Sequence, residues 1–316
     1  MSWTASAHRE ADPSSWTLRQ ISREMAPLNF DRFRVMLSCP DRKGIVAEVS
    51  GLLARQGANV TAAAQFSDPA LGQFFVRYEV ETAAGEATAE SLKEGLTEGL
   101  ADLLSHSDAH LSVRSADHRP RVALLASKAS HCLVEVLQRW RTGELPCDIV
   151  CVIANHPHIE EFAGWFKVPF HHIPFAPGDK ATSFAQVEAL LKEHAVDVTV
   201  LARFMQIIPD AFAEAHLGRM INIHHSFLPS FIGARPYEQA HARGVKLVGA
   251  TCHYVTPELD QGPIIDQEVV RISHRDTPAD LRRKGRICER EALARGLRLH
   301  LEDRVFVHGN RTVVFD

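Results

Sequence analysis

The sequence predicts an α/β protein in which a small ferredoxin-like domain precedes a larger, Rossmann-like domain with a mostly parallel sheet. Its 316 residues are enough for two domains of ordinary size. Near the N-terminus, strand-like and helical segments follow one another in the order β-α-β-β-α-β, which is the ferredoxin-like order. Further on, strands and helices alternate, and residues 196–201 are mostly apolar and rich in valine, which favours a buried parallel strand. We expect a flexible extension at 1–30, the small domain at 31–115, a linker at 116–120 and the large domain at 121–316.

Composition and charge argue against several classes of protein. Hydrophobic residues make up 45% of the chain and charged residues 23%, as in ordinary globular proteins, and the net charge is −4. The chain has no long basic run, so we expect no nucleic-acid partner. It has no apolar stretch near the roughly 20 residues of a membrane helix, and residues 1–28 lack the apolar core of a secretion signal. We therefore expect a cytoplasmic protein without a membrane partner.

The cysteines and histidines do not form a recognisable ligand pattern. Six cysteines occur without any Cys-x-x-Cys pair, so we interpret them as reduced thiols that pack in the interior. Eighteen histidines occur without a His-Glu-x-x-His motif. We therefore expect no metal site and full activity after chelation.

The small domain is predicted from four strand-like runs and two helical segments. Apolar residues recur at helical spacing within 45–55, and Gly57 then ends the helix. A second helix is predicted over 88–104. Strands are predicted at 33–37, 60–66, 74–80 and 111–113.

The large domain is predicted from alternating strands and helices. Strands are expected at 122–126, 148–154, 171–174, 196–201, 220–224 and 247–255. Helices are expected at 131–141, 158–166, 181–194, 210–215 and 277–301, and we expect the many arginines of the last helix to form a solvated outer face. A terminal hairpin is expected from strands at 305–307 and 312–315. The first βα turn, at 126–131, lacks the glycines of dinucleotide-binding and phosphate-binding loops.

Two stretches carry the candidate chemistry. The strand at 220–224 places Asn222 and His224 on one face at its carboxyl end, where open parallel sheets bind ligands. The second stretch follows the strand at 247–255 and presents Asp260 on a turn. A carboxamide and an imidazole can donate hydrogen bonds to an oxyanion, and a carboxylate can activate water. An isolated Asn-x-His is more often a polar pair or a turn device, so the two stretches together predict hydrolysis or transfer of an acyl group.

These two stretches resemble a known family. Asn222-x-His224-x-Ser226-x-Leu228-Pro229, followed by Leu259-Asp260-x-Gly262-Pro263-Ile264-Ile265, is similar to the paired motifs of the folate-dependent formyltransferase fold. His225 stands where glycinamide ribonucleotide formyltransferases typically have proline, which resembles the formyltetrahydrofolate deformylase branch. The resemblance extends from about Asp31 to the C-terminus. It implies an N-terminal ACT domain followed by a catalytic domain with a formyltransferase-fold sheet.

The resemblance also implies a reaction and a set of site residues. The reaction is hydrolysis of 10-formyltetrahydrofolate to tetrahydrofolate and formate, with the folate as substrate and no cofactor. Asn222 and His224 are then expected to stabilise the oxyanion, while Asp260 activates water and shuttles a proton. Substrate contacts are expected from Arg203, Phe204, Met205, Gln206, Ile207, His225, Ser226, Val255 and Gly262. For Arg203 the alternative is a structural ion pair, and for Phe204 and Ile207 it is core packing.

Two other functions stay open at this point. One is a formyltransferase that uses an amine acceptor, and the other is an ACT-bearing regulatory protein without turnover. The absence of glycines from the first βα turn argues against a ribonucleotide acceptor, because related transformylases bind the phosphate there. The sequence does not determine whether the pathway served is purine supply, one-carbon balance or methyl-group catabolism.

The small domain raises the question of an effector. The turn formed by Asp41, Arg42, Gly44 and Ile45 resembles that of ACT domains, which often bind small amino acids. An amino-acid effector at this turn and an empty dimerisation module are equally good interpretations. Ferredoxin-like units leave a sheet edge that pairs readily with another chain, so we expect a homo-oligomer, either a dimer or a tetramer.

Overall fold

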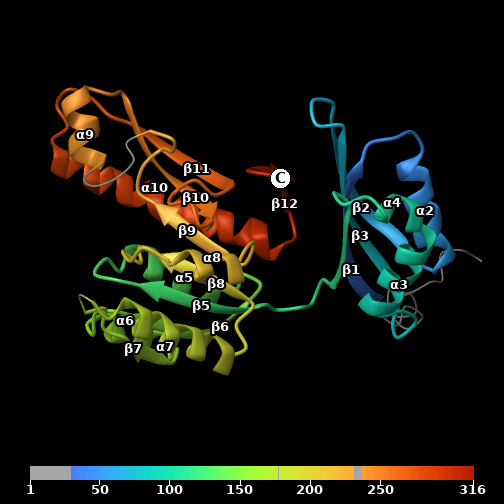
Figure 1. The fold of residues 1–316 in the computed structure, drawn as a ribbon, viewed down its shortest axis with the longest axis horizontal. Helices are drawn as coiled ribbons and strands as arrows, with labels where there is room; N and C mark the ends of the chain where they lie inside the picture. Colours follow the sequence, from blue (N-terminus) through green and yellow to red (C-terminus); the bar gives the residue numbers. More distant parts are fainter. Residues whose placement is uncertain (1–29, 177, 231–235) are drawn as a thin grey trace, which may run out of the picture.

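The computed structural model describes residues 30–176, 178–230 and 236–316, which form two sheet-based domains (Figure 1). The expected extension at 1–30 lies almost entirely outside the described residues. Figure 1 shows the small domain, with β1 to β4, on one side and the large domain, with β5 to β11, on the other.

The small domain has an antiparallel four-stranded sheet in the order β2-β3-β1-β4, the ferredoxin-like order predicted from the sequence. Its elements are β1 (Phe30–Pro40), α2 (Ile45–Arg55), β2 (Asn59–Asp68), β3 (Gln73–Ala83), α3 (Ala89–Gly99), α4 (Ala101–Leu104) and β4 (His110–Ser115). The helix predicted over 88–104 is divided at Leu100, which leaves helical geometry at φ −114° and ψ 20°. Just before this break, Gly99 lies so close to α2 that an added Cβ would be 2.2 Å from Leu52 Cδ2.

The large domain is a seven-stranded sheet in the order β11-β10-β9-β8-β5-β6-β7. Strands β5 to β9 are parallel, and β10 and β11 extend the sheet with antiparallel pairing. The strands are β5 (Arg121–Ala126), β6 (Asp148–Ala154), β7 (Phe170–His172), β8 (Val198–Ala202), β9 (Met220–His224), β10 (Leu247–Tyr254) and β11 (Ile264–Arg271). The chain runs outward from β5 to β7 and then returns to place β8 on the other side of β5. The strand order therefore reverses between β5 and β8, where such sheets bind ligands.

Helices cover both faces of this sheet. They are α5 (His131–Arg141), α6 (Ile159–Trp165), α7 (Lys180–Glu193), α8 (Asp210–Ala215), α9 (Pro236–Arg243) and α10 (Pro278–Leu301). One buried cluster joins α5, α6 and α10 to one face, and another joins α7 and α8 to the opposite face. Alternate residues of β5 enter the two clusters, as the pleat of a strand requires. The sequence did not predict α9 or β11.

Helix α10 differs from the expected solvated helix. Leu281, Cys288 and Leu293 are buried against the sheet, and Glu289 is only 1% exposed. Several of the arginines face solvent as expected, but Arg295 forms ion pairs with carboxylates of β11. The helix therefore packs along the sheet over much of its 24 residues. No helix in the described part of the chain combines the length and apolar character of a membrane span.

A C-terminal hairpin connects the two domains. It consists of β12 (Val305–His308) and β13 (Arg311–Val314), and Phe306 packs edge-on against Phe75 of β3 with ring centroids 5.6 Å apart. Beside this contact, Arg77 Nε donates to the Asp303 carbonyl at 2.9 Å, and Arg114 Nη1 lies 2.7 Å from Asp303 Oδ1. Arg34 Nη1 donates to the Leu301 carbonyl at 3.2 Å. The end of α10 and the hairpin thus contact the small domain through both apolar and charged groups.

Candidate active site

A cavity of about 410 Å³ opens at the carboxyl ends of β8 and β9, beside the loop that follows β10. Its walls come from the end of β9, the loop after β8 and the loop after β10. They are Leu201, Arg203, Phe204, Met205, Gln206, Ile207, Ile208, Asn222, Ile223, His224, His225, His253, Val255, Thr256, Pro257, Leu259 and Asp260. Met205, Ile207 and Leu259 are 58%, 60% and 56% exposed, which is unusual for large apolar side chains. A cavity with apolar walls and a few convergent polar groups is typical of a small-molecule site.

The polar centre of the cavity is a contact between His224 and Asp260. His224 Nδ1 lies 3.2 Å from Asp260 Oδ1, although His224 ends β9 and Asp260 lies on the loop after β10. His224 is 6% exposed, and its Nε2 has no hydrogen-bond partner in the described part of the chain. Burial alone would raise the pKa of Asp260, but the hydrogen bond from His224 and the neighbouring histidines lower it below its ordinary value. Asp260 is therefore a carboxylate at neutral pH.

His253 holds Asn222 in place, and the sequence did not single it out. His253 Nδ1 lies 2.8 Å from the Tyr254 carbonyl, which only accepts, so Nδ1 carries the proton. The unprotonated Nε2 then accepts from Asn222 Nδ2 at 3.1 Å. Burial lowers the pKa of His253 and keeps the ring neutral. The sequence offered one cue to this residue, an imidazole within the mostly apolar run at 247–255. In the structure His253 lies directly opposite Asn222 in the β9–β10 register.

Arg203 is fixed by a buried carboxylate from α10. Arg203 Nε lies 3.2 Å from Glu289 Oε2, and Glu289 also accepts from His131 Nε2 at 2.8 Å and from the Tyr237 hydroxyl at 2.7 Å. Burial would raise the pKa of Glu289, but the bond from His131 and the charge of Arg203 outweigh burial and lower it. Arg203 thus has the ion pair that the sequence left as one alternative, and it also lines the cavity.

The same network brings three kinds of metal ligand together. Potential ligand atoms of His131, Cys132 and Glu289 all lie within 4.8 Å of one another. Both Glu289 oxygens already accept hydrogen bonds, and Arg203 places a positive charge beside them. Burial raises the pKa of the Cys132 thiol well above its ordinary value, so it remains protonated. These residues fit a hydrogen-bonded network and do not fit a cation site.

Two predicted contact residues do not line the cavity. Ser226 Oγ donates to the Ser230 carbonyl at 2.9 Å, so it holds the loop after β9. Gly262 lies against β10, where an added Cβ would be 1.8 Å from the Tyr254 carbonyl oxygen. Both residues shape the loops that carry the site, and neither faces the cavity. We also expected the loop at 226–233 to border the formyl group, and residues 231–233 of that loop lie outside the described residues.

The turn of the small domain has the expected local geometry. Gly44 precedes α2 with a φ of 94°, a left-handed conformation that favours glycine. Ile45 is buried, while Arg42 forms an ion pair with Glu48 at 2.5 Å. The Asp41 amide donates to the Gly72 carbonyl at 2.8 Å.

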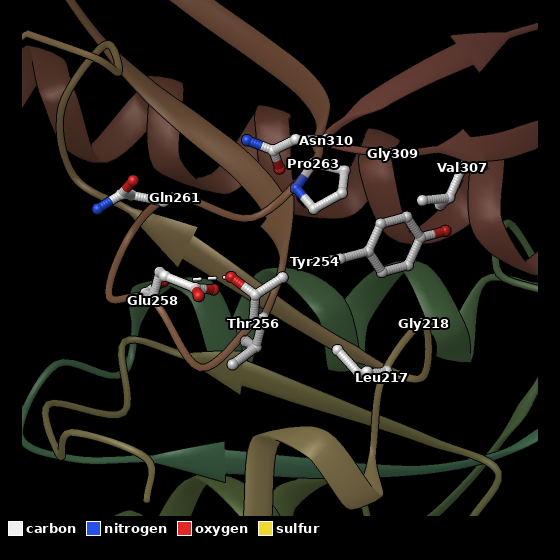
Figure 2. Close-up of a pocket in the computed structure, with 11 residues that line it drawn as sticks. Leu217, Gly218, Tyr254, Thr256, Glu258, Gln261, Pro263, Val307, Gly309 and Asn310 are labelled. Carbon is white, nitrogen blue, oxygen red and sulfur yellow. Dashed lines mark hydrogen bonds between the residues drawn. The ribbon is translucent and has the colours of Figure 1, made fainter. Parts of the chain in front are cut away.

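A separate cavity, of about 540 Å³, is lined in part by Glu258 and Gln261 of the loop after β10. Figure 2 shows the residues that line it. Tyr254, Thr256 and Glu258 form one side, and the turn of the β12–β13 hairpin forms another. Thr256 Oγ1 donates to the Glu258 carbonyl at 3.2 Å (Figure 2). Of the predicted site residues only Val255 borders this cavity. The reactive groups therefore gather in the smaller cavity described above.

Known proteins are similar to this chain over both of its domains. The family model described as formyl transferase matches residues 120–297, and the ACT domain model matches 33–94. The chain is 45% identical to the formyltetrahydrofolate deformylase of Bacillus subtilis over 91% of this chain and 95% of the relative. It is 44% identical to the formyltetrahydrofolate deformylase of Synechocystis sp. over 89% of this chain and 97% of the relative.

Solved structures agree with the sequence comparisons. A formyltetrahydrofolate deformylase from Pseudomonas syringae pv. tomato superposes with a TM-score of 0.87 at 46% identity, over 94% of this chain and 99% of that chain. A glycinamide ribonucleotide transformylase from Symbiobacterium toebii has a TM-score of 0.61 at 31% identity, over 64% of this chain and 97% of that chain. The predicted fold class and the predicted resemblance are both confirmed.

The buried network around Glu289 should contribute to the free energy of unfolding. Glu289→Gln removes the charge opposite Arg203 and should lower the free energy of unfolding by about 3–5 kcal/mol, because a buried cation is left without its partner. The control is Glu291→Gln on the same helix, which breaks the more exposed ion pair with Arg139 and should cost less than about 1 kcal/mol. Urea denaturation of both variants measures the difference. Equal losses would show that the Glu289 network does not contribute in this way.

Proposed function

The chain belongs to the formyltetrahydrofolate deformylase family, and from that premise we propose that it hydrolyses 10-formyltetrahydrofolate to tetrahydrofolate and formate. The observation that carries the proposal is the 3.2 Å contact between His224 and Asp260 beside a largely apolar cavity. In this proposal residues 121–316 form the catalytic unit and residues 31–115 the ACT unit. The folate is the substrate, and neither a metal nor a cofactor takes part.

The cavity suits the pterin end of a folate. Its volume of about 410 Å³ lies within the range of roughly 300–1,000 Å³ that small-molecule pockets occupy. Apolar side chains at its mouth, among them Met205, Ile207 and Leu259, offer flat surface that a ring can cover. Substrate contacts are assigned to the predicted residues that line it, which are Arg203, Phe204, Met205, Gln206, Ile207, His225 and Val255.

Asn222 and His224 stabilise the formyl oxygen as it becomes negative. With Nδ1–H directed at Asp260, His224 donates a second hydrogen bond from Nε2 as the imidazolium. Nε2 is buried and otherwise unpaired in the described structure, so its hydrogen bond is directed to the substrate. Asn222 uses one amide hydrogen on His253 and keeps the other for the same oxygen. Two donors held in a buried site form an oxyanion hole.

Asp260 moves the proton that hydrolysis requires. As a carboxylate it accepts a proton from the attacking water, whose oxygen forms a bond to the formyl carbon. The proton then passes to the folate nitrogen as the C–N bond breaks, which yields tetrahydrofolate and formic acid, and the acid ionises to formate. Burial and the nearby charge of Arg203 lower the pKa of His225 to about 4. A neutral His225 at the edge of the cavity can therefore orient the water by donating one hydrogen bond and accepting another.

An assay without any acceptor tests the reaction. The full-length protein with 10-formyltetrahydrofolate and excess chelator should release formate and tetrahydrofolate in equal amounts. A formyltransferase would be nearly idle under these conditions, and a regulatory protein without turnover would be inactive. Activity that disappears on chelation and returns with one divalent ion would contradict the metal-free mechanism.

Variants test the roles of the three central residues. Asn222→Ala and His224→Ala should each lower kcat by about 10²–10³, the usual cost of losing one oxyanion donor. Asp260→Asn keeps the shape of the side chain but removes the base, so hydrolysis should be almost abolished. Binding of tetrahydrofolate, measured by calorimetry, should stay close to that of the unchanged protein. Any of these variants that keeps more than about a third of the original kcat removes that residue from the mechanism.

The ACT unit is proposed to assemble the protein and to bind an amino-acid effector near Asp41. Support for assembly comes from β2, an edge strand of ten residues of which none is buried. Phe66 on this strand is 43% exposed. Such an edge can pair with the same strand of a second copy and form a dimer, and two dimers form a tetramer.

Light scattering tests the assembly. The unchanged protein should be a dimer or a tetramer, and Phe66→Lys should shift it towards smaller species, because a lysine opposes pairing at a sheet edge. Phe30→Lys is the control, since Phe30 is similarly exposed but lies on the internal strand β1. A monomeric unchanged protein would contradict the assembly role. A screen of the common amino acids that finds neither binding nor a rate change would contradict the effector.

A further inference from the structure

A second cavity, of about 240 Å³, adjoins the catalytic cavity. Arg203 and His225 line both cavities, so the reacting centre borders each of them. Ala129 follows β5 and Arg203 follows β8, which places the second cavity at the reversal of strand order between those two strands. Doubly wound sheets bind ligands at this position. The remaining walls come from the start of α5, the start of α9 and one side of α10.

The charges around this cavity do not cancel. Three arginines and two glutamates line it. Glu289 faces Arg203 at 3.2 Å, and Glu238 faces Arg282 at 2.5 Å. Arg286, the third arginine, has no carboxylate partner among the described residues. The walls therefore carry one uncompensated positive charge.

Arg203, which lines this cavity, also has a hydrogen-bond donor without an acceptor among the described residues. Its Nη1 is buried and has no hydrogen-bond acceptor in the described part of the chain. Leaving a charged donor buried without a partner costs free energy, and an anion that accepts from it removes that cost. The guanidinium forks of Arg203 and Arg286 match the two oxygens of a carboxylate.

We propose that this second cavity binds formate, the carboxylate product of hydrolysis, before it is released. The inference rests on the proposed function, which generates a formate ion beside His225 while the folate fills the other cavity. A monoanion balances the single excess charge. At about 240 Å³ the cavity holds formate with several waters of roughly 30 Å³ each, and it lies below the range of roughly 300–1,000 Å³ usual for larger ligands. The adjacent turn at 126–131 has no glycine with which to cradle a phosphate.

This placement predicts a particular kinetic pattern. Because formate and folate occupy different cavities, both bind at the same time. Added formate should therefore inhibit the reaction without competing with 10-formyltetrahydrofolate. Formate that occupied only the oxyanion site would compete with the substrate, so a purely competitive pattern would contradict the proposal.

A direct binding experiment tests the site. Carbon-13-labelled formate is titrated into the full-length protein with tetrahydrofolate present and ionic strength held constant with chloride, and binding is followed by NMR line broadening. The protein should bind formate saturably, and Arg286→Gln should weaken binding about tenfold or more, the typical effect of losing one charge-assisted hydrogen bond. Arg286→Lys, which keeps the charge but loses the fork, should be intermediate.

The control is Arg283→Gln on the same helix. Arg283 is exposed, pairs with Asp280 at 3.1 Å and does not line the cavity, so its loss should change formate affinity by less than about twofold. Unchanged affinity in Arg286→Gln, binding that tetrahydrofolate abolishes, or no saturable binding at all would overturn the proposal. Saturable, Arg286-dependent binding in a protein that does not hydrolyse 10-formyltetrahydrofolate would support the carboxylate site and contradict the proposed function alone.

Discussion

The contact between His224 Nδ1 and Asp260 Oδ1 is the interaction on which the site depends. It joins the end of β9 to the loop after β10. Because β10 is antiparallel to β9, Tyr254 at the end of β10 pairs with Ile221 near the start of β9, so the loop folds back along β9 to reach His224. The loop reaches this position because Gly262 lets its backbone approach the Tyr254 carbonyl closely. Asp260 itself adopts a left-handed φ of 57°, which costs on the order of 1–2 kcal/mol for a residue with a side chain. Contacts elsewhere in the fold must offset this cost.

A second ion pair, between Arg203 and Glu289, lies close to the site. Arg203 also has a left-handed φ, of 64°, and its position depends on Glu289 of α10. The same helix ends at Leu301, whose carbonyl accepts from Arg34 of the small domain. At about 1.5 Å per residue, its 24 residues span roughly 36 Å. One rigid element therefore contacts both Arg203, which lines the candidate catalytic cavity, and the ACT unit.

Much of the fold could be predicted from local sequence, because apolar periodicity and turn residues are local signals. Helix α9 escaped prediction because its sequence, Pro236 to Arg243, is polar and has no clear apolar stripe. Asn222, His224 and Asp260 were identifiable from two short motifs, and the loop after β10 brings Asp260 to His224. His253 and Glu289 were not identified, because their roles depend on partners in other strands and helices. Glu289 meets His131 across 158 sequence positions, and no local pattern encodes that contact.

A double-mutant cycle on kcat tests the central claim that His224 and Asp260 act as one unit. His224→Ala, Asp260→Asn and the double variant are compared with the unchanged protein under saturating 10-formyltetrahydrofolate. If the two side chains act together, the double variant should be no slower than the slower single variant, to within about threefold. If the two losses multiply, the residues act independently, and the mechanism built on their contact is wrong.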